Sequence, residues 1–97
     1  MKPMLLFEDD FNTFTNDLNK KEYESFNGEN LKITFIEAIL KPRSLWFIEL
    51  ETNDSTYYLW VDKKHFEHFR KLLKKDKTGK AMFFQELKRT IFYPSLQ

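Results

Sequence analysis

Two short runs rich in β-branched and aromatic residues, Leu45–Glu51 and Thr56–Val61, constrain the fold more than any other feature of the sequence. Only the segment 52–55 separates them, so the runs can pair only as an antiparallel hairpin. A two-residue loop at 53–54 fixes the register, because a shift by one residue would turn every side chain to the other face. This register predicts an apolar face made of the pairs Trp46–Val61, Ile48–Leu59 and Leu50–Tyr57. The opposite face pairs Phe47 with Trp60 and Glu49 with Tyr58, mixing aromatic rings with carboxylates.

A second hairpin is predicted at Asn27-Gly28, because these two residue types tolerate the positive φ of a type I′ turn. The flanking segments 22–26 and 31–40 have strand-like compositions. Within 31–40 the apolar residues change from odd to even positions near Glu37, which predicts either a β-bulge or a strand buried on both faces. The segment 42–44, which begins with Pro42, then turns the chain into the first hairpin.

Helical periodicity predicts three helices around this sheet. Phe7, Phe11, Phe14 and Leu18 share one face of a helix near 9–20. Asp62 is a good N-cap for a helix over 63–75, whose buried stripe is Phe66, Phe69, Leu72 and Leu73. Gly79 is expected to interrupt the helical segment, and Thr78 is the next candidate cap. A last helix is predicted over 80–92, ending before Pro94. Ala81, Phe84, Leu87 and Ile91 form its apolar stripe.

These elements predict a single α+β domain over residues 1–97. It contains an antiparallel three- to four-stranded meander sheet with an N-terminal helix and two C-terminal helices, in the order α-(β)-β-β-β-α-α. The length of 97 residues fits one domain. A hydrophobic fraction of 41% supplies a core, and a charged fraction of 32% favours solubility.

The sequence also predicts a cytoplasmic location. There is no cysteine for the disulfides that small extracellular domains need. The N-terminus lacks the pattern of a signal peptide, and no apolar run approaches the roughly 20 residues of a transmembrane helix. The abundance of Lys, Asn and Phe suggests an AT-rich genome, such as that of a phage or another mobile element.

Catalytic, cofactor and metal sites are not expected. The chain has only two glycines, too few for a phosphate-binding loop, and it lacks the motifs of an activated nucleophile. His65 and His68 have a spacing that would let both reach one metal ion, but no third ligand is evident nearby. We therefore predict a protein that is not an enzyme and that carries neither a cofactor nor a metal ion.

Charge divides the chain at Asp62. Residues 1–62 contain six Lys or Arg against twelve Asp or Glu, whereas residues 63–97 contain ten against three. Such an asymmetry is typical of proteins that bind polyanions. The alternative is that the acidic part neutralises the basic part within the fold.

Basic helices beside a sheet with aromatic residues predict a nucleic-acid site, because lysines bind phosphates and exposed rings stack on bases. The candidate phosphate-binding residues are Lys63, Lys64, Arg70, Lys71, Lys74, Lys75, Lys77 and Lys80. The candidate stacking residues are Phe47, Tyr58 and Trp60. The alternative is that the rings lie beneath a helix as core and that the lysines form an ordinary solvated surface.

The order of strands followed directly by a helix, through Tyr58-Leu59-Trp60-Val61-Asp62-Lys63-Lys64-His65-Phe66, resembles the single-strand-binding modules of the Pur-alpha and Whirly kind. The resemblance covers residues 22–75 and rests on no specific motif. It implies a four-stranded sheet preceding a helix, in dimers that bind single-stranded nucleic acid.

The leading hypothesis is therefore a non-catalytic module that binds nucleic acid, preferably single-stranded. The alternative is a protein-interaction module, such as a small phage or mobile-element regulator or inhibitor that docks on a protein partner. Pairing of acidic with basic parts could also form homo-oligomers such as dimers. No membrane partner is expected.

Overall fold

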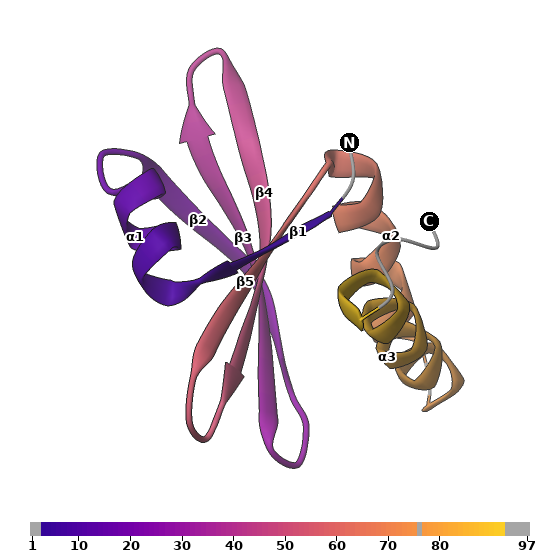
Figure 1. Ribbon diagram of the computed structural model, residues 1–97. Helices are drawn as coiled ribbons and strands as arrows, with labels where there is room; N and C mark the ends of the chain where they lie inside the picture. The colour runs from indigo at the N-terminus through magenta and orange to yellow at the C-terminus, as the bar shows by residue number, and fades with distance from the viewer. Residues whose placement is uncertain (1–2, 76, 93–97) are drawn as a thin grey trace.

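The computed structural model describes residues 3–75 and 77–92. Five strands form one antiparallel sheet in the order β1-β5-β4-β3-β2. The elements are β1 (Met4–Phe7), α1 (Glu8–Thr15), β2 (Asn19–Asn27), β3 (Leu31–Leu40), β4 (Arg43–Thr52), β5 (Thr56–Val61), α2 (Lys63–Lys74) and α3 (Lys77–Phe92). Strands β2 to β5 form a meander, and β1 joins the sheet beside β5 (Figure 1). The predicted α+β class with one N-terminal and two C-terminal helices is confirmed.

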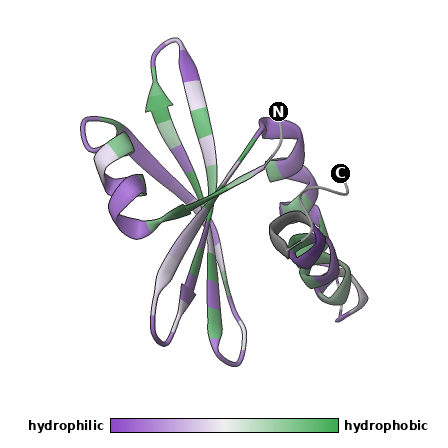
Figure 2. Ribbon diagram, in the orientation of Figure 1, coloured by the Kyte–Doolittle hydropathy of each residue, from purple (hydrophilic) through white to green (hydrophobic). Residues whose placement is uncertain are grey.

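Helices cover both faces of the sheet. In Figure 1 the sheet stands between α1 on one side and α2 with α3 on the other. Strand residues alternate between these two sides, and Figure 2 shows hydrophobic residues along β3 and β4. The face toward α2 and α3 is called face A below, and the face toward α1 is called face B.

Face A holds the larger core. Phe35, Ile48 and Leu59 lie side by side across the three central strands and are buried beneath Phe66 and Phe69 of α2. Phe83 and Leu87 of α3 belong to the same cluster, in which the rings of Phe69 and Phe83 meet edge to face with their centroids 5.4 Å apart. Both C-terminal helices are therefore anchored by the hydrophobic core.

Face B holds a smaller core beneath α1. Phe11 of this helix stacks on Tyr58 at a centroid distance of 3.6 Å and meets Phe47 edge to face at 4.9 Å. Ile36 and Ala38 of β3 complete the buried cluster. Strand β3 is thus buried on both faces, which is one of the two alternatives that its change of apolar phase predicted.

The predicted register of β4 and β5 is confirmed, with Trp46 opposite Val61 and Ile48 opposite Leu59. The hairpin between β2 and β3 is also present, but its turn differs from the prediction. No described residue has a positive φ, so Asn27-Gly28 does not form a type I′ turn, and the connection runs through Gly28, Glu29 and Asn30. The irregularity lies in β2, between Glu22 and Ser25, while β3 pairs with β4 without interruption.

Three sequence predictions need correction. Met4–Phe7 forms a strand paired with β5, which raises the number of strands from the predicted three or four to five. The first helix ends at Thr15 because residues from Asn19 onward pair with β3. The last helix begins at Lys77 and includes Gly79, so this glycine does not interrupt it. The predicted stop at Pro94 lies outside the described residues.

Gly79 lets α3 approach the end of α2 closely. A Cβ atom at this position would lie 2.2 Å from the Leu72 carbonyl oxygen and 2.6 Å from the Lys75 Cβ. Both distances are far shorter than van der Waals contact, and neither atom lies at the end of a flexible side chain. The contact between α2 and α3 therefore requires glycine here.

No helix in residues 3–75 and 77–92 is both long and apolar enough to cross a lipid bilayer.

We expect Gly79→Ala to destabilise the protein by about 1–3 kcal/mol, because the added methyl group would push α3 away from α2. Helix propensity alone predicts the opposite sign, since alanine is favoured over glycine by about 1 kcal/mol in a helix. Urea unfolding measures the difference. Gly28→Ala is the control, because its Cβ would meet only the Leu31 carbonyl oxygen, at 3.3 Å. A Gly79→Ala variant as stable as the wild type would contradict the close approach.

Candidate functional site

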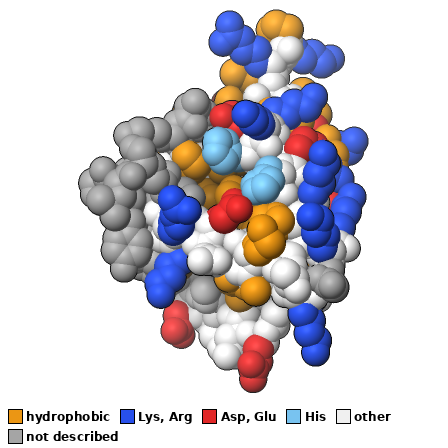
Figure 3. All heavy atoms as spheres, turned by 90° about the vertical axis from the view of Figure 1, so that its right-hand side faces the viewer, with side chains coloured by type: hydrophobic (Ala, Val, Ile, Leu, Met, Phe, Trp, Pro, Cys, Tyr) orange, Lys and Arg blue, Asp and Glu red, His pale blue; other side chains and the backbone are white. Residues whose placement is uncertain are grey.

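The eight predicted basic residues lie on or between the two C-terminal helices. Five are on α2, Lys75 follows its end, and Lys77 and Lys80 are in the first part of α3. Figure 3 looks onto this side of the molecule and shows blue Lys and Arg side chains gathered beside the two histidines. The helices bring together residues that the sequence only placed in one segment.

Arg70 is engaged within the protein. Its Nε donates a hydrogen bond to Glu24 Oε2 over 2.8 Å, and its Nη2 donates to Glu24 Oε1 over 2.5 Å. Its guanidinium lies over the Tyr23 ring, with Cζ 4.7 Å from the ring centroid, and its Nη1 also reaches Glu67 at 3.2 Å. The bidentate pair with Arg70 lowers the pKa of Glu24 to about 2 and raises the pKa of Arg70. Arg70 therefore joins α2 to the edge strand β2.

Two further candidates contact other groups of the same protein. Lys74 Nζ lies 3.3 Å from Glu24 Oε1, although the lysine side chain is half exposed. Lys63 Nζ lies 5.8 Å from the centre of the Trp46 ring. Both remain at the surface, and of the two only Lys74 forms an ion pair within the described residues.

Five of the eight candidates are free to meet an external anion. They are exposed and have neither an ion pair nor a contact with an aromatic ring among the residues in the described ranges; they are Lys64, Lys71, Lys75, Lys77 and Lys80. Lys88, which the sequence analysis did not select, is also exposed and lies three helical turns after Lys77 on nearly the same side of α3. We call Lys64, Lys71, Lys75, Lys77, Lys80 and Lys88 the basic surface. Helical spacing was the signal that could have identified Lys88.

Carboxylates within the described parts of α2 and α3 do not cancel this charge. Glu67 is bound by Arg70, and Glu86 is 3.0 Å from His68 Nε2. Much of the acidic surplus lies across the sheet, where Glu8, Asp9 and Asp10 form the first turn of α1. Neutralisation of the basic part by the acidic part is therefore seen where Glu24 pairs with Arg70 and Lys74. The basic surface keeps its charge.

The predicted stacking platform is buried for the most part. Phe47 is completely buried, and Tyr58 is only 6% exposed. The Tyr58 hydroxyl donates a hydrogen bond to Glu49 Oε2 over 2.8 Å, and burial together with this contact raises the tyrosine pKa. The prediction that Phe47 and Tyr58 stack on bases is therefore wrong, because Phe11 of α1 covers both rings.

Trp60 is half-buried and has Phe14 of α1 beside it, with the ring centroids 5.2 Å apart. One partly accessible indole remains from the predicted platform. It lies on face B, on the opposite side of the sheet from the basic surface. The structure thus separates the aromatic and basic halves of the predicted site.

The two histidines contact different carboxylates. His65 Nδ1 lies 2.7 Å from Asp62 Oδ1, which also accepts a hydrogen bond from the His65 backbone N–H as the N-cap of α2. This capping lowers the pKa of Asp62. His68 instead links α2 to α3 through Glu86. Among the residues that the structure describes, no cluster of three or more His, Asp or Glu side chains could hold a metal ion.

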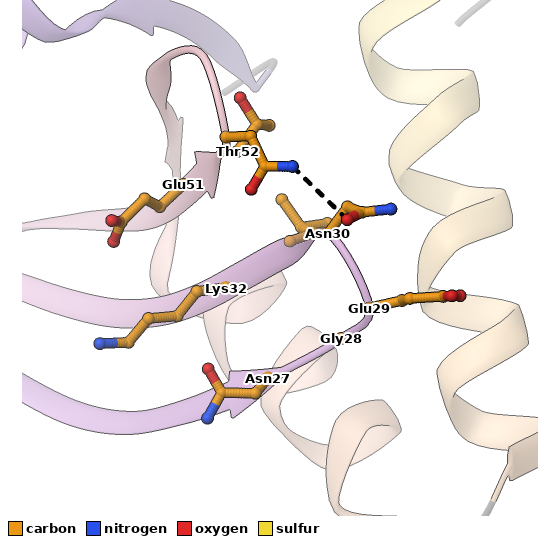
Figure 4. A pocket seen from close by; sticks show the side chains of 9 residues that line it. Asn27, Gly28, Glu29, Asn30, Lys32, Glu51 and Thr52 are labelled. Carbon is orange, nitrogen blue, oxygen red and sulfur yellow. Dashed lines mark hydrogen bonds between the residues drawn. The ribbon is translucent and has the colours of Figure 1, made fainter.

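A hollow of about 190 Å³ lies where the β2–β3 and β4–β5 hairpin tips meet. Figure 4 shows it lined by loop and strand-end residues, with Asn53 Nδ2 donating to Asn30 Oδ1 over 3.5 Å. Lys32 and two carboxylates, Glu29 and Glu51, line its rim. These charges are of mixed sign, and none of the residues that line the hollow belongs to the basic surface.

Glu24→Gln should flatten the dependence of stability on pH. The pKa of Glu24 is lowered from 4.5 to about 2 in the folded protein, so its pair with Arg70 contributes fully above pH 4.5 and is lost as the pH falls toward 2. Urea unfolding of wild type and variant at a series of pH values across this range measures the difference. Glu29→Gln, which alters an exposed loop residue, should keep the wild-type profile. Equal profiles for wild type and Glu24→Gln would show that the pair adds no stability.

Comparisons with protein-family models, with curated proteins and with solved structures find no match to this chain. The likeness to the Pur-alpha and Whirly modules gains no support from them and remains one of element order.

Proposed function

We propose that the protein binds the phosphate backbone of nucleic acid through the basic surface of α2 and α3. The observation that carries this proposal is that six exposed lysines lie on two adjacent helices without an ion pair to any described residue. Keeping like charges together costs electrostatic free energy, which the phosphates of an external polyanion reduce by neutralising the lysines. The counterions released from the nucleic acid favour binding further.

The burial of Phe47 and Tyr58 changes the expected preference. Single-strand binders gain affinity by stacking bases on exposed rings, whereas two of the three rings predicted for this role are buried and the third, Trp60, lies on face B. Recognition of phosphates alone favours the duplex, because double-stranded DNA has the higher charge density. We therefore propose binding that is largely independent of sequence, with a duplex bound at least as tightly as a single strand. The proposal assigns no catalytic residue.

The binding test uses fluorescence anisotropy with a labelled duplex and the matching single strand, at salt concentrations from about 25 to 200 mM. Each phosphate contact contributes a slope of about −0.9 to the plot of log affinity against log salt for a duplex. The triple variant Lys64→Glu, Lys71→Glu, Lys75→Glu should lower the affinity at least about tenfold and make the slope shallower by about 2–3.

The matched control is the triple variant Lys32→Glu, Lys41→Glu, Arg43→Glu. It makes the same change in net charge at exposed residues on β3, β4 and the turn between them. Its affinity should fall much less, because these residues lie outside the basic surface. Equal losses in both variants would show that only net charge matters, and no binding by the wild type at the lowest salt would remove the proposal.

A protein-interaction role finds support in a different part of the molecule, the exposed apolar side chains of β1.

A further inference from the structure

Strand β1 is an edge strand with large apolar side chains at the surface. Met4 is 50% exposed, Leu5 37% and Phe7 62%. Phe14 of α1, beside Trp60 on face B, is 50% exposed as well. Alternation along the strand places Met4 on face B, opposite Trp60, and Phe7 on face A against Tyr57. The outer side of β1 therefore offers apolar side chains on both faces of the sheet, together with the unpaired backbone groups of an edge.

The other edge of the sheet is protected. Strand β2 carries Lys20, Lys21 and Glu22 in succession, all exposed, and its pairing with β3 is irregular between Glu22 and Ser25. Charged residues and bulges are the features by which proteins prevent edge-to-edge pairing. The described residues of β1 include neither a charge nor a bulge. The contrast shows that the two edges are not equivalent and that β1 is the one suited to accept another strand.

Charges of opposite sign lie at the two ends of this open edge. Met4 is opposite Trp60, so the N-terminal end of β1 lies near the start of α2. Lys63, which lies over the Trp46 ring of β4, and Lys64 are both exposed there, and together they outweigh the single carboxylate of Asp62. The other end leads directly into α1, whose first two residues are Glu8 and Asp9. Figure 1 shows β1 running between these two places. The edge is therefore positive at one end and negative at the other.

We propose that β1 pairs antiparallel with β1 of a second copy of this chain, forming a two-fold symmetric dimer with a continuous sheet. Antiparallel pairing brings the acidic end of each edge to the basic end of the other, whereas parallel pairing would bring like charges together. In a two-fold symmetric antiparallel pair, one residue of β1 must lie opposite the same residue of the second copy. Leu5 and Leu6 are the central residues of the strand, so one of them takes this position. Exposed apolar groups of both copies then cover each other.

The symmetry has a consequence for the basic surface. A two-fold axis perpendicular to a sheet keeps each face on the same side, so α2 and α3 of both copies would lie on one side of the joined sheet. The dimer would thus present two basic surfaces in the same direction. The dimer itself does not depend on the proposed binding of nucleic acid, and it is tested without it.

Sedimentation velocity of the full chain over a range of protein concentrations tests the dimer. We expect a reversible monomer–dimer equilibrium that the double variant Met4→Lys, Phe7→Lys weakens at least about tenfold, because lysines on an edge oppose pairing. The matched control is Leu40→Lys, Phe84→Lys, which replaces two similarly exposed apolar residues elsewhere (48% and 41% exposed) and should leave the equilibrium unchanged. A monomeric wild type, or equal weakening in both variants, would overturn the proposal. Circular dichroism of each variant tests whether it is folded.

A charge exchange tests the orientation of the two strands. One variant carries Glu8→Lys and Asp9→Lys, and the other carries Lys63→Glu and Lys64→Glu. Each should dimerise less than the wild type by itself, because like charges then meet at both ends of the interface. An equimolar mixture should recover a dimer, since a pair of unlike chains restores opposite charges at both ends. A single variant that dimerises as well as the wild type would overturn the antiparallel arrangement, because parallel pairing already brings like charges together. Absence of recovery in the mixture would overturn the role of the charges.

Discussion

The fold depends on the burial of the central strands on both faces of the sheet. Side chains alternate along β3, β4 and β5, so neighbouring residues serve different cores. Phe35 and Ile48 pack beneath α2, whereas Ile36 and Phe47 pack beneath α1. A helix on one face alone would leave the other row of apolar side chains in water. The positions of all three helices follow from this requirement, and so does the separation of the surfaces that they carry.

The sheet consequently separates charge as well as cores. The acidic first turn of α1 lies on face B, and the basic residues of α2 and α3 lie over face A. At the edge of the sheet the acidic part of the sequence meets the basic helices, where Glu24 of β2 forms ion pairs with Arg70 and Lys74. This contact fixes α2 on the sheet and uses two cations. The remaining lysines keep their charge toward the solvent, and the proposed binding of phosphates depends on them.

The two edges of the sheet show a similar division of roles. Strand β2 is charged, irregular and held by Arg70, so it ends the sheet. Strand β1 is short and apolar and has opposite charges at its ends. An antiparallel pair of such edges would form backbone hydrogen bonds, bury the apolar side chains and bring opposite charges together. The proposed dimer would also place two basic surfaces on one side, where a long polyanion could contact both, and such bivalence raises affinity without any new kind of contact.

The sequence by itself determined the elements whose signals are local. Short connections and alternating side chains fixed the β4–β5 register, and the Asp62 cap fixed the start of α2, because these features depend on residues close together in the chain. The basic residues of the candidate site were also identified from their position in one helical segment, apart from Lys88. The strand Met4–Phe7 was missed because a run of four apolar residues shows no period of its own, and only β5, distant in sequence, makes it a strand.

Tertiary structure alone decided which side chains reach the surface. Phe47, Tyr58 and Trp60 lie on one face of the sheet, as the residues of an exposed stacking platform would. Helix α1 covers that face, so Phe47 and Tyr58 are part of the core. Gly79 has the signature of a helix breaker, yet it lies within α3, where the missing side chain leaves room for the end of α2. Which basic residues are paired and which are free depended on where Glu24 lies, 46 residues before Arg70. Burial and ion pairing are set by contacts between distant segments, and composition and periodicity do not contain them.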